Sequence, residues 1–251
     1  MSTLFRLIAG DFRKIQRSSI VWIHVIVPIL ITSAFLFYYS FSNINNISKV
    51  EGFMEVLSVG FPLIIGIVCA MVVEQEACAG NFQELLMSKN KLLNFVSKVC
   101  MLILMALGSL ITAIGGLALG LKFLLHKNSF SAAFYGKIIL LLLFCEIFLY
   151  LMHLLCSFKF GSGASIGIGI AEGLVSALML TGLGNGLWQL IPCSWGGRVS
   201  NYYIRLNTYK GNIEIYRWEF QSGIYMFIIA TVLLFLASLL WFNKFEGRRE
   251  D

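Results

Sequence analysis

The sequence predicts an all-α integral membrane protein with six transmembrane helices. Of its 251 residues, 58% are hydrophobic and 13% are charged, and the mean hydropathy is +0.82, whereas a soluble domain has about 25% charged residues. The apolar residues gather in six stretches near the roughly 20 residues that a helix needs to cross a bilayer core of about 30 Å. These stretches centre on residues 20–41, 56–73, 99–121, 136–158, 164–191 and 223–242. Lipid offers no hydrogen-bond partners, so each span should be helical.

The N-terminal segment, residues 1–18, is expected to form an amphipathic helix in the membrane interface. At about 100° per residue, one side of residues 4–17 carries Leu4, Phe5, Ile8, Phe12 and Ile15. The opposite side carries Arg6, Arg13 and Arg17. Such a helix lies with its cations toward anionic headgroups and water. The alternative is a solvated basic segment leading into the first span.

Two residues within the first span stand out. Pro28 should kink this span because it removes a backbone hydrogen bond. His24, near the cytoplasmic end of the span, is expected to be a satisfied or interfacial histidine, with a proton relay as the alternative.

Charge predicts the orientation of the first span and of the whole chain. The net charge is +6, and basic residues flank the first and last spans. Positive flanks stay cytoplasmic, so both termini should lie on the cytoplasmic side of the cell membrane. The external loop 192–222 does not fit this pattern, because it is also basic. Charges clustered beside spans argue for a bilayer and against nucleic acid as the partner.

The segment between the second and third spans, residues 74–91, is expected to be a cytoplasmic docking element. It contains three acids, Glu74, Glu76 and Glu84, and a short apolar ridge of Phe82, Leu85 and Leu86. Phe82 and Leu86 are four residues apart, so they share one face of a helix. An exposed apolar ridge in polar surroundings is typical of an interaction surface. The alternative is that the ridge packs on the protein's own cytoplasmic surface.

Small residues at four-residue spacing predict close helix packing in two spans. The third span carries Gly108, Thr112, Gly116 and Gly120, and the fifth carries the pairs Gly163/Gly167, Gly169/Gly173 and Gly182/Gly186. The partner helices could belong to this chain or to another subunit.

Two acids lie within spans, where ionisable residues are costly and suggest function. Glu146 is near the middle of span four, with His153 seven residues further on the same face, and Glu172 is in span five. Either Glu146 is a protonated group that holds the bundle together, or these residues serve a transport pathway or coupling.

Residues 192–222 form the one long connection, and it is rich in aromatic residues. Trp195, Trp218 and several tyrosines are expected to form an interfacial belt, with contact to headgroups or an amphiphilic peptide as the alternative. Cys193 is the one cysteine expected outside, so an external disulfide within the chain has no partner, and the sequence contains no C-x-x-C pair.

The sequence carries no nucleotide-binding signature. The phosphate loop G-x-x-x-x-G-K-[ST] has no match, because Gly136-Lys137 is followed by Ile138. We therefore expect no catalytic residues and no cofactor in this chain, and transport against a gradient would need a partner or an ion.

The order of these parts resembles the permease subunits of ABC-2 type exporters over essentially the whole chain, as a single domain, residues 1–251. The family's loose pattern after span two matches Glu76, Gly80, Leu85, Leu86, Lys89 and Lys91. Within that family the chain looks most like the G-type, mutacin-immunity-like permease of lantibiotic immunity transporters. That likeness is carried by the length, the stretch EQEACAGNFQELL, and Trp188, Ile191, Pro192 and Ser194, although Cys193 stands where many relatives have tryptophan.

The resemblance implies a working unit of several proteins. An ATPase dimer, which holds the ATP and magnesium, would sit beneath this chain and a second, E-type permease. The loop 74–91 would be the coupling helix, with Glu76, Gly80, Phe82, Glu84, Leu85 and Leu86 as its coupling residues. The exported molecule would be an amphipathic antimicrobial peptide.

A passive structural or sensor protein is one alternative, although it would not need the acidic docking loop, and two more specific rivals remain. One is an ABC-2 permease for bacitracin, another drug or a lipid. The other is an intramembrane enzyme that uses Glu146 and His153, which would need a second acid or a metal triad nearby; the sequence has no H-E-x-x-H motif, so no metal site is expected.

Overall fold

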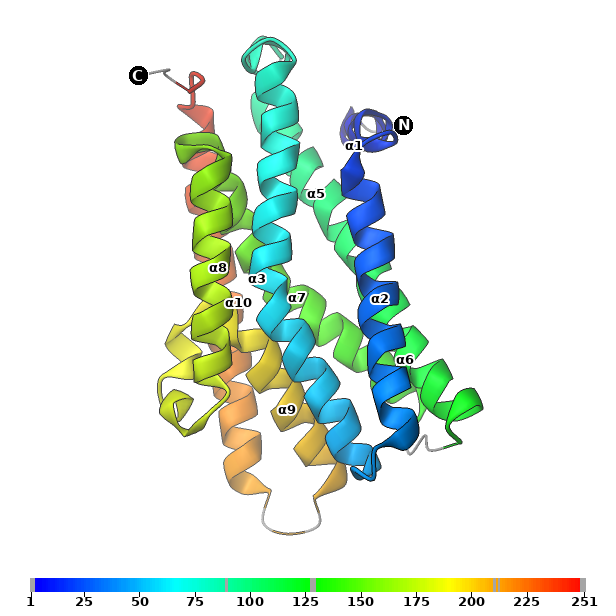
Figure 1. Cartoon of the computed structure of the whole chain (residues 1–251). Coiled ribbons are helices and arrows are strands. Elements are labelled where there is room, and N and C mark those ends of the chain that lie inside the picture. Colours follow the sequence, from blue (N-terminus) through cyan, green and yellow to red (C-terminus); the bar gives the residue numbers. More distant parts are fainter. Residues whose placement is uncertain (1–2, 89, 127–129, 210, 212, 249–251) are drawn as a thin grey trace.

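The computed structural model describes residues 3–88, 90–126, 130–209, 211 and 213–248, and every regular element within them is a helix. Six of the helices are long and apolar enough to cross a membrane, which confirms the predicted architecture. Figure 1 shows both chain ends at the same end of the bundle, which we call the termini end. Three of the basic residues beside the predicted spans, Lys89, Lys210 and Arg249, lie outside the described residues.

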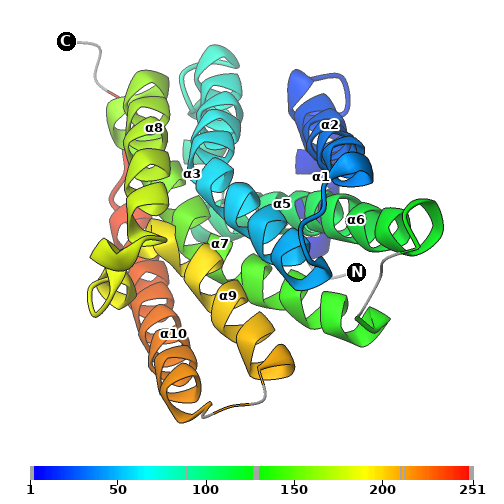
Figure 2. The same ribbon diagram turned by 60° about the horizontal axis from the view of Figure 1, so that its bottom comes forward.

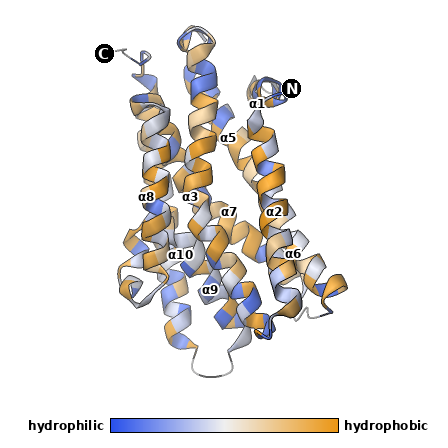
Figure 3. Ribbon diagram, in the orientation of Figure 1, coloured by the Kyte–Doolittle hydropathy of each residue, from blue (hydrophilic) through white to orange (hydrophobic). Residues whose placement is uncertain are grey.

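The spans are α2 (Ser19–Phe41), α3 (Asn46–Cys78), α5 (Lys91–Leu110, continuing to Leu124), α7 (Ala132–Phe160), α8 (Ser162–Met179) and α10 (Glu214–Asn243). Three further helices connect or flank them: α1 (Thr3–Ile15), α4 (Gln83–Leu86) and α9 (Trp195–Thr208). Apolar residues cover the middle of the long helices, and polar residues gather toward the two ends of the bundle (Figure 3).

Local sequence explains where several helices begin. The first backbone N–H groups of a helix lack partners within it, and a short polar side chain can accept from them. The Ser18 hydroxyl accepts from the Ile20 N–H before α2. Asn45 Oδ1 accepts from the Ser48 N–H at 2.8 Å before α3.

The packing of α2 on α5 uses hydroxyl groups that donate to backbone carbonyls beside irregularities in the two helices. Pro28 has no N–H, so the His24 carbonyl, four residues earlier, loses its partner; the Ser109 hydroxyl of α5 donates to it at 2.9 Å. The continuation of α5 contains a π-helical turn, Ile111–Gly115. The Thr32 hydroxyl of α2 donates to the Ala113 carbonyl of this turn at 3.1 Å.

The small residues of span five pack against α3 of the same chain. A Cβ on Gly169 would lie 2.7 Å from the Pro62 carbonyl oxygen, and one on Gly173 would lie 3.2 Å from that of Val59. Gly66 of α3 approaches the Ser165 carbonyl equally closely. In contrast, Gly167 has nothing within 4 Å of its Cβ position, so only one face of α8 is an intrachain interface.

The other two glycine patterns are only partly interfaces. The third span ends in a π-helical turn, Gly120–Leu124. Gly116 and Gly120 of this span face Thr32 and Leu36 of α2. In contrast, a Cβ on Gly108 would meet nothing within 4 Å. The predicted pair Gly182/Gly186 does not lie on a transmembrane helix, because α8 ends at Met179 and residues Gly182–Gly184 form a 3-10 turn.

The connection 192–222 is not an open loop with an aromatic belt. It contains α9, which packs against α3, α7 and α10 (Figure 2). Trp195 and Trp188 are buried, whereas Trp218 is 64% exposed. The belt interpretation is therefore wrong for Trp195, which packs with Phe148 and Phe227 inside the bundle. Aromatic content alone does not distinguish a membrane-surface residue from a core residue.

Candidate functional site

At the termini end, the chain leaves α3 through a tight turn before α4. Gly80, Asn81 and Phe82 have φ values of +103°, +48° and +65°, a region that residues other than glycine rarely adopt. The Phe82 N–H donates to the Glu76 carbonyl at 3.2 Å and the Asn81 N–H to the Ala77 carbonyl at 2.7 Å. These two bonds satisfy carbonyl groups of the last turn of α3, which have no partner within the helix, and they fix where the loop begins.

The predicted exposed ridge is not exposed. Phe82 and Leu85 are 1% and 2% exposed, and Leu86 is half-buried against the same core. The Phe82 ring contacts Phe158 of α7 and Phe245 beyond α10, with centroid separations of 5.8 and 5.5 Å. The expectation of an exposed docking ridge is therefore wrong, because aromatic residues from α7 and from beyond α10 cover the ridge. The alternative, that the ridge packs on the protein's own surface, is right.

The exposed face of this segment carries polar, small and apolar residues together. It consists of Cys78, Ala79, Gly80, Asn81, Gln83, Glu84 and Met87. Glu84 is 68% exposed as a side chain, and Met87 is 84% exposed. Any partner at this end would contact these residues, while Phe82 and Leu85 hold the segment on the bundle.

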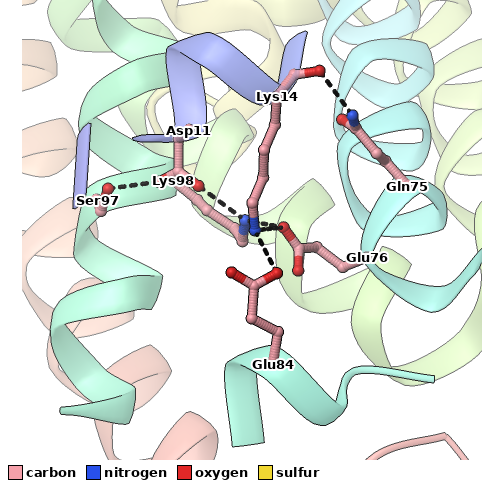
Figure 4. A network of polar contacts seen from close by, with 7 residues as sticks. All are labelled: Asp11, Lys14, Gln75, Glu76, Glu84, Ser97 and Lys98. Carbon is pink, nitrogen blue, oxygen red and sulfur yellow. Dashed lines mark hydrogen bonds and ion pairs between the residues drawn. The ribbon is translucent and has the colours of Figure 1, made fainter. Parts of the chain in front are cut away.

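Lys98 is the centre of a buried polar network that ties this segment to the bundle (Figure 4). Its side chain is 4% exposed on α5, and its Nζ donates to Glu76 Oε1 at 2.6 Å and to Asp11 Oδ1 at 3.1 Å. The Ser97 hydroxyl donates to the other oxygen of Asp11. A buried charge is tolerated only when it is paired, and here one lysine serves carboxylates from α1 and α3.

Lys14 of α1 extends the network to the loop. Its Nζ donates to Glu76 Oε1 at 3.1 Å and to Glu84 Oε2 at 3.0 Å. Gln75 Nε2 donates to the Lys14 carbonyl at 2.9 Å. Partial burial alone would lower the pKa of Lys14, but the bonds to the Glu84 and Glu76 carboxylates outweigh it and raise this pKa. Lys14 is therefore a charged link between α1, the end of α3 and α4.

These groups line a polar crevice of about 300 Å³ between α1 and the α3–α5 connection. Two lysines face three carboxylates there, those of Asp11, Glu76 and Glu84. Charge-assisted bonds thus join α1, α3 and α5 through the buried Lys98, and they join α4 through the more exposed pair of Lys14 and Glu84.

Sequence reasoning found only part of this network. It named Glu76 and Glu84, but not Asp11, Lys14 or Lys98. One signal was visible: Lys98 follows an apolar run and begins the third span, where a charge needs a partner. The sequence did not indicate that this partner is Asp11, which lies 87 residues away along the chain.

The C-terminal residues also hold the loop. Arg248 lies over the Phe82 ring, 5.7 Å from its centroid, and its Nη2 donates to the Ser157 carbonyl of α7 at 2.8 Å. Arg248 Nη1 also lies 3.7 Å from a carboxylate oxygen of Glu74. The chain end beyond α10 is thus packed onto the same turn.

Within the membrane, His153 pairs with Glu172 and not with Glu146. His153 Nε2 lies 3.0 Å from Glu172 Oε2. The Ser165 hydroxyl gives its hydrogen to the Gly66 carbonyl at 3.0 Å, so His153 Nδ1 donates to Ser165, also at 3.0 Å. These bonds join α3, α7 and α8 beside their glycine contacts.

Glu146 lies apart from this cluster. It is 4% exposed on α7 and lines a cavity with His24 and Tyr150. The pair of Glu146 and His153 proposed for an intramembrane enzyme is therefore not assembled. Among the described residues, no three His, Cys, Asp or Glu side chains are grouped to hold a metal ion.

The comparisons with known proteins address the family of this chain. Residues 7–176, more than half of the chain, match the model of the ABC-2 family transporter protein. The comparisons with curated proteins and with solved structures give no match. Six membrane-spanning helices agree with the matched family. The chain belongs to the ABC-2 family of transporter proteins.

Proposed function

We propose that this ABC-2 permease subunit belongs to an ATP-driven exporter that removes lantibiotic-type antimicrobial peptides from the membrane, for self-immunity or resistance. The termini end would face the cytoplasm of a bacterial cell. ATP and magnesium would bind to a separate ATPase dimer, and a second, E-type permease would complete the transporter. The alternative cargo is bacitracin, another drug or a lipid.

The observation that carries the proposal is the anchored loop between α3 and α5. An ATPase at the termini end would meet an exposed face that includes Gln83, Glu84 and Met87. Glu84 is bonded through Lys14 to Glu76, and Glu76 to Lys98. Movement of the ATPase would therefore be passed to α1, α3 and α5 without relying on a flexible linker.

The opposite half of the molecule offers chemistry that suits an amphipathic peptide. A hollow of about 320 Å³ lies between the turn after α8 and the start of α10. Its rim includes Leu190 and Trp218, which are 66% and 64% exposed, and Glu219 lies beside them. Glu219 Oε2 accepts from Trp188 Nε1 at 2.9 Å and from Gln189 Nε2 at 2.7 Å, so a carboxylate is held next to apolar surface.

Co-purification tests the coupling part of the proposal. The tagged chain would be extracted from its native membranes in mild detergent, and the eluate assayed for ATP hydrolysis and for co-purifying proteins. We expect an ATPase and a second six-span protein. The double substitution Gln83→Arg with Met87→Asp on the exposed face should abolish ATPase recovery without unfolding the chain. The control, Gln221→Arg on the exposed surface of α10 away from the polar crevice, should retain it.

Killing curves test the cargo. Cells that carry the complete transporter would be compared with cells lacking only this chain, in the presence of a lantibiotic or of bacitracin. Selective loss of lantibiotic survival is expected. Recovery of the chain alone under several detergents would overturn the exporter, whereas an ATPase-bound chain that protects only against bacitracin would overturn the peptide assignment alone.

A further inference from the structure

A cavity between α2, α3, α5 and α7 contains two buried polar atoms without a partner among the described residues. Glu146 and His24, which are 4% and 6% exposed, both line this cavity. Glu146 Oε1 and His24 Nε2 have no hydrogen-bond partner there. Buried polar atoms are almost always satisfied, so two orphaned atoms in one cavity call for an explanation.

The bonds already made define what these atoms need. His24 Nδ1 lies 2.8 Å from the Ile20 carbonyl; a carbonyl only accepts, so Nδ1 carries the hydrogen. In the neutral ring, Nε2 is then an acceptor. An ionised Glu146 carboxylate is also only an acceptor. When Glu146 is ionised, these two side chains present two acceptors to the cavity and no free donor.

Size and lining restrict the partner further. The cavity measures about 70 Å³, whereas one water needs about 10–15 Å³. Its other walls are almost wholly apolar, including Leu57 and Ile65 of α3. A group with several N–H donors on a short hydrocarbon chain would satisfy both acceptors and contact these walls.

The cavity has a route from the bilayer. Its lining residues on α7 are buried, whereas Ile23 and Val27 of α2 and Phe61 and Ile64 of α3 are only half-buried. The rim therefore lies between α2 and α3, where a molecule partitioned into lipid would approach.

We propose that this cavity binds a primary alkylammonium group, with the Glu146 carboxylate as counter-ion and His24 Nε2 as the second acceptor. The ammonium supplies three N–H donors and cancels the charge of the carboxylate, and the alkyl chain extends toward the rim. If the ammonium belongs to a lysine side chain of an exported peptide, that identification rests on the proposed function; the site itself does not.

Equilibrium dialysis of radiolabelled n-butylamine against the purified full chain tests the site directly. The chain would be held in nanodiscs of phosphatidylcholine and phosphatidylglycerol, whose headgroups have no primary ammonium. Saturable binding near one per chain is expected. Neutral n-butanol should not compete, and butyltrimethylammonium, which has the charge but no N–H donor, should compete weakly.

Two variants remove the site by different means. Glu146→Gln keeps the shape and removes the charge, and should weaken binding at least about tenfold, because a bond to a charged group contributes roughly 1.5–3 kcal/mol. Gly60→Leu keeps the carboxylate and fills the cavity; its Cβ would meet nothing within 4 Å, so the helix should tolerate it. The matched control is Glu172→Gln, an intramembrane acid paired with His153 elsewhere, which should bind as the unmodified chain does.

The different lipids and competitors distinguish the possible occupants of the cavity. Weaker butylamine binding in phosphatidylethanolamine nanodiscs would support the site and identify a lipid headgroup as an occupant. Competition by a lysine-bearing amphipathic peptide, but not by its Nε-acetylated form, would support the site with a peptide occupant. Equal binding of butanol, or undiminished binding in Glu146→Gln, would overturn the proposal. Absence of amine binding would also overturn it, in favour of a protonated Glu146 that shares its hydrogen with His24. No ATPase is involved, so this test and that of the proposed function can fail separately.

Discussion

Lys98 and Glu76 form a buried ion pair of 2.6 Å between α5 and the end of α3. The same lysine holds Asp11 of α1, so three helices depend on one side chain at the point where the loop begins. Breaking a buried pair leaves an uncompensated charge, which is far more costly than removing both partners. This asymmetry makes the network testable.

Lys98→Met should strongly destabilise the termini end. It leaves Asp11 buried without a cation and Glu76 with only the half-buried Lys14, at a cost of about 3–5 kcal/mol. Thermal unfolding in detergent should show the loss, and α1 should become sensitive to protease. Lys14→Met is the matched control, because Lys14 is 36% exposed as a side chain, and pairs near the surface contribute about 0–1 kcal/mol. Equal effects of the two substitutions would contradict the central role of Lys98.

Gly169→Ala should loosen the contact of α8 with α3. The added Cβ would lie 2.7 Å from the Pro62 carbonyl oxygen, and overpacking of this kind costs about 1–3 kcal/mol. Gly167→Ala, on the same helix with nothing within 4 Å of its Cβ position, should leave the melting temperature unchanged. If both variants melted alike, the close approach of α3 and α8 would be wrong.

Gly80→Ala should weaken the turn before α4 through the backbone alone. At φ +103°, a Cβ would meet only Gln83 Oε1, at 3.9 Å, so the cost of about 1–2 kcal/mol would come from conformation and not from contacts. Limited proteolysis between α3 and α5 is the measurement. Gly136→Ala, in a helical segment with open space, should have no such effect; an unchanged cleavage rate for Gly80→Ala would argue against the strained turn.

Thiol labelling should determine the orientation. Cys78 is exposed at the termini end, whereas Cys193 is 5% exposed. Burial raises the pKa of Cys193 to about 12, and since the thiolate is the nucleophile, its labelling at neutral pH should be slow. A membrane-impermeant maleimide should therefore label Cys78 only after the cells are permeabilised. The substitution Asn43→Cys, at the exposed turn after α2 at the other end, provides the control that should label in intact cells. The reverse pattern would invert the proposed topology.

The number of spans could be predicted because hydropathy is a local property: a stretch of about 20 apolar residues is stable across lipid whatever surrounds it. The amphipathic N-terminal helix followed from the periodicity of its own residues in the same way. The predicted loop 74–91 began too early, because Glu76 lies within α3, which ends at Cys78. The burial of Phe82 could not be predicted from the sequence. Whether this ring faces water or a core depends on where Phe158 and Phe245 lie, and those residues come from distant parts of the chain.

The sequence by itself determined that the chain lies in a membrane, that it has six spanning helices, and which residues are too polar to face lipid. Tertiary structure alone decided which of those residues meet: Asp11 with Lys98, His153 with Glu172, and Glu146 with a cavity that also contains His24. The physical reason is that lipid is as apolar as the helix surfaces, so hydrophobicity does not choose partners within the bilayer. Close approach at glycines such as Gly169, and donors such as Ser109 for carbonyls left free, select the neighbours; both are properties of two helices together and not of either one.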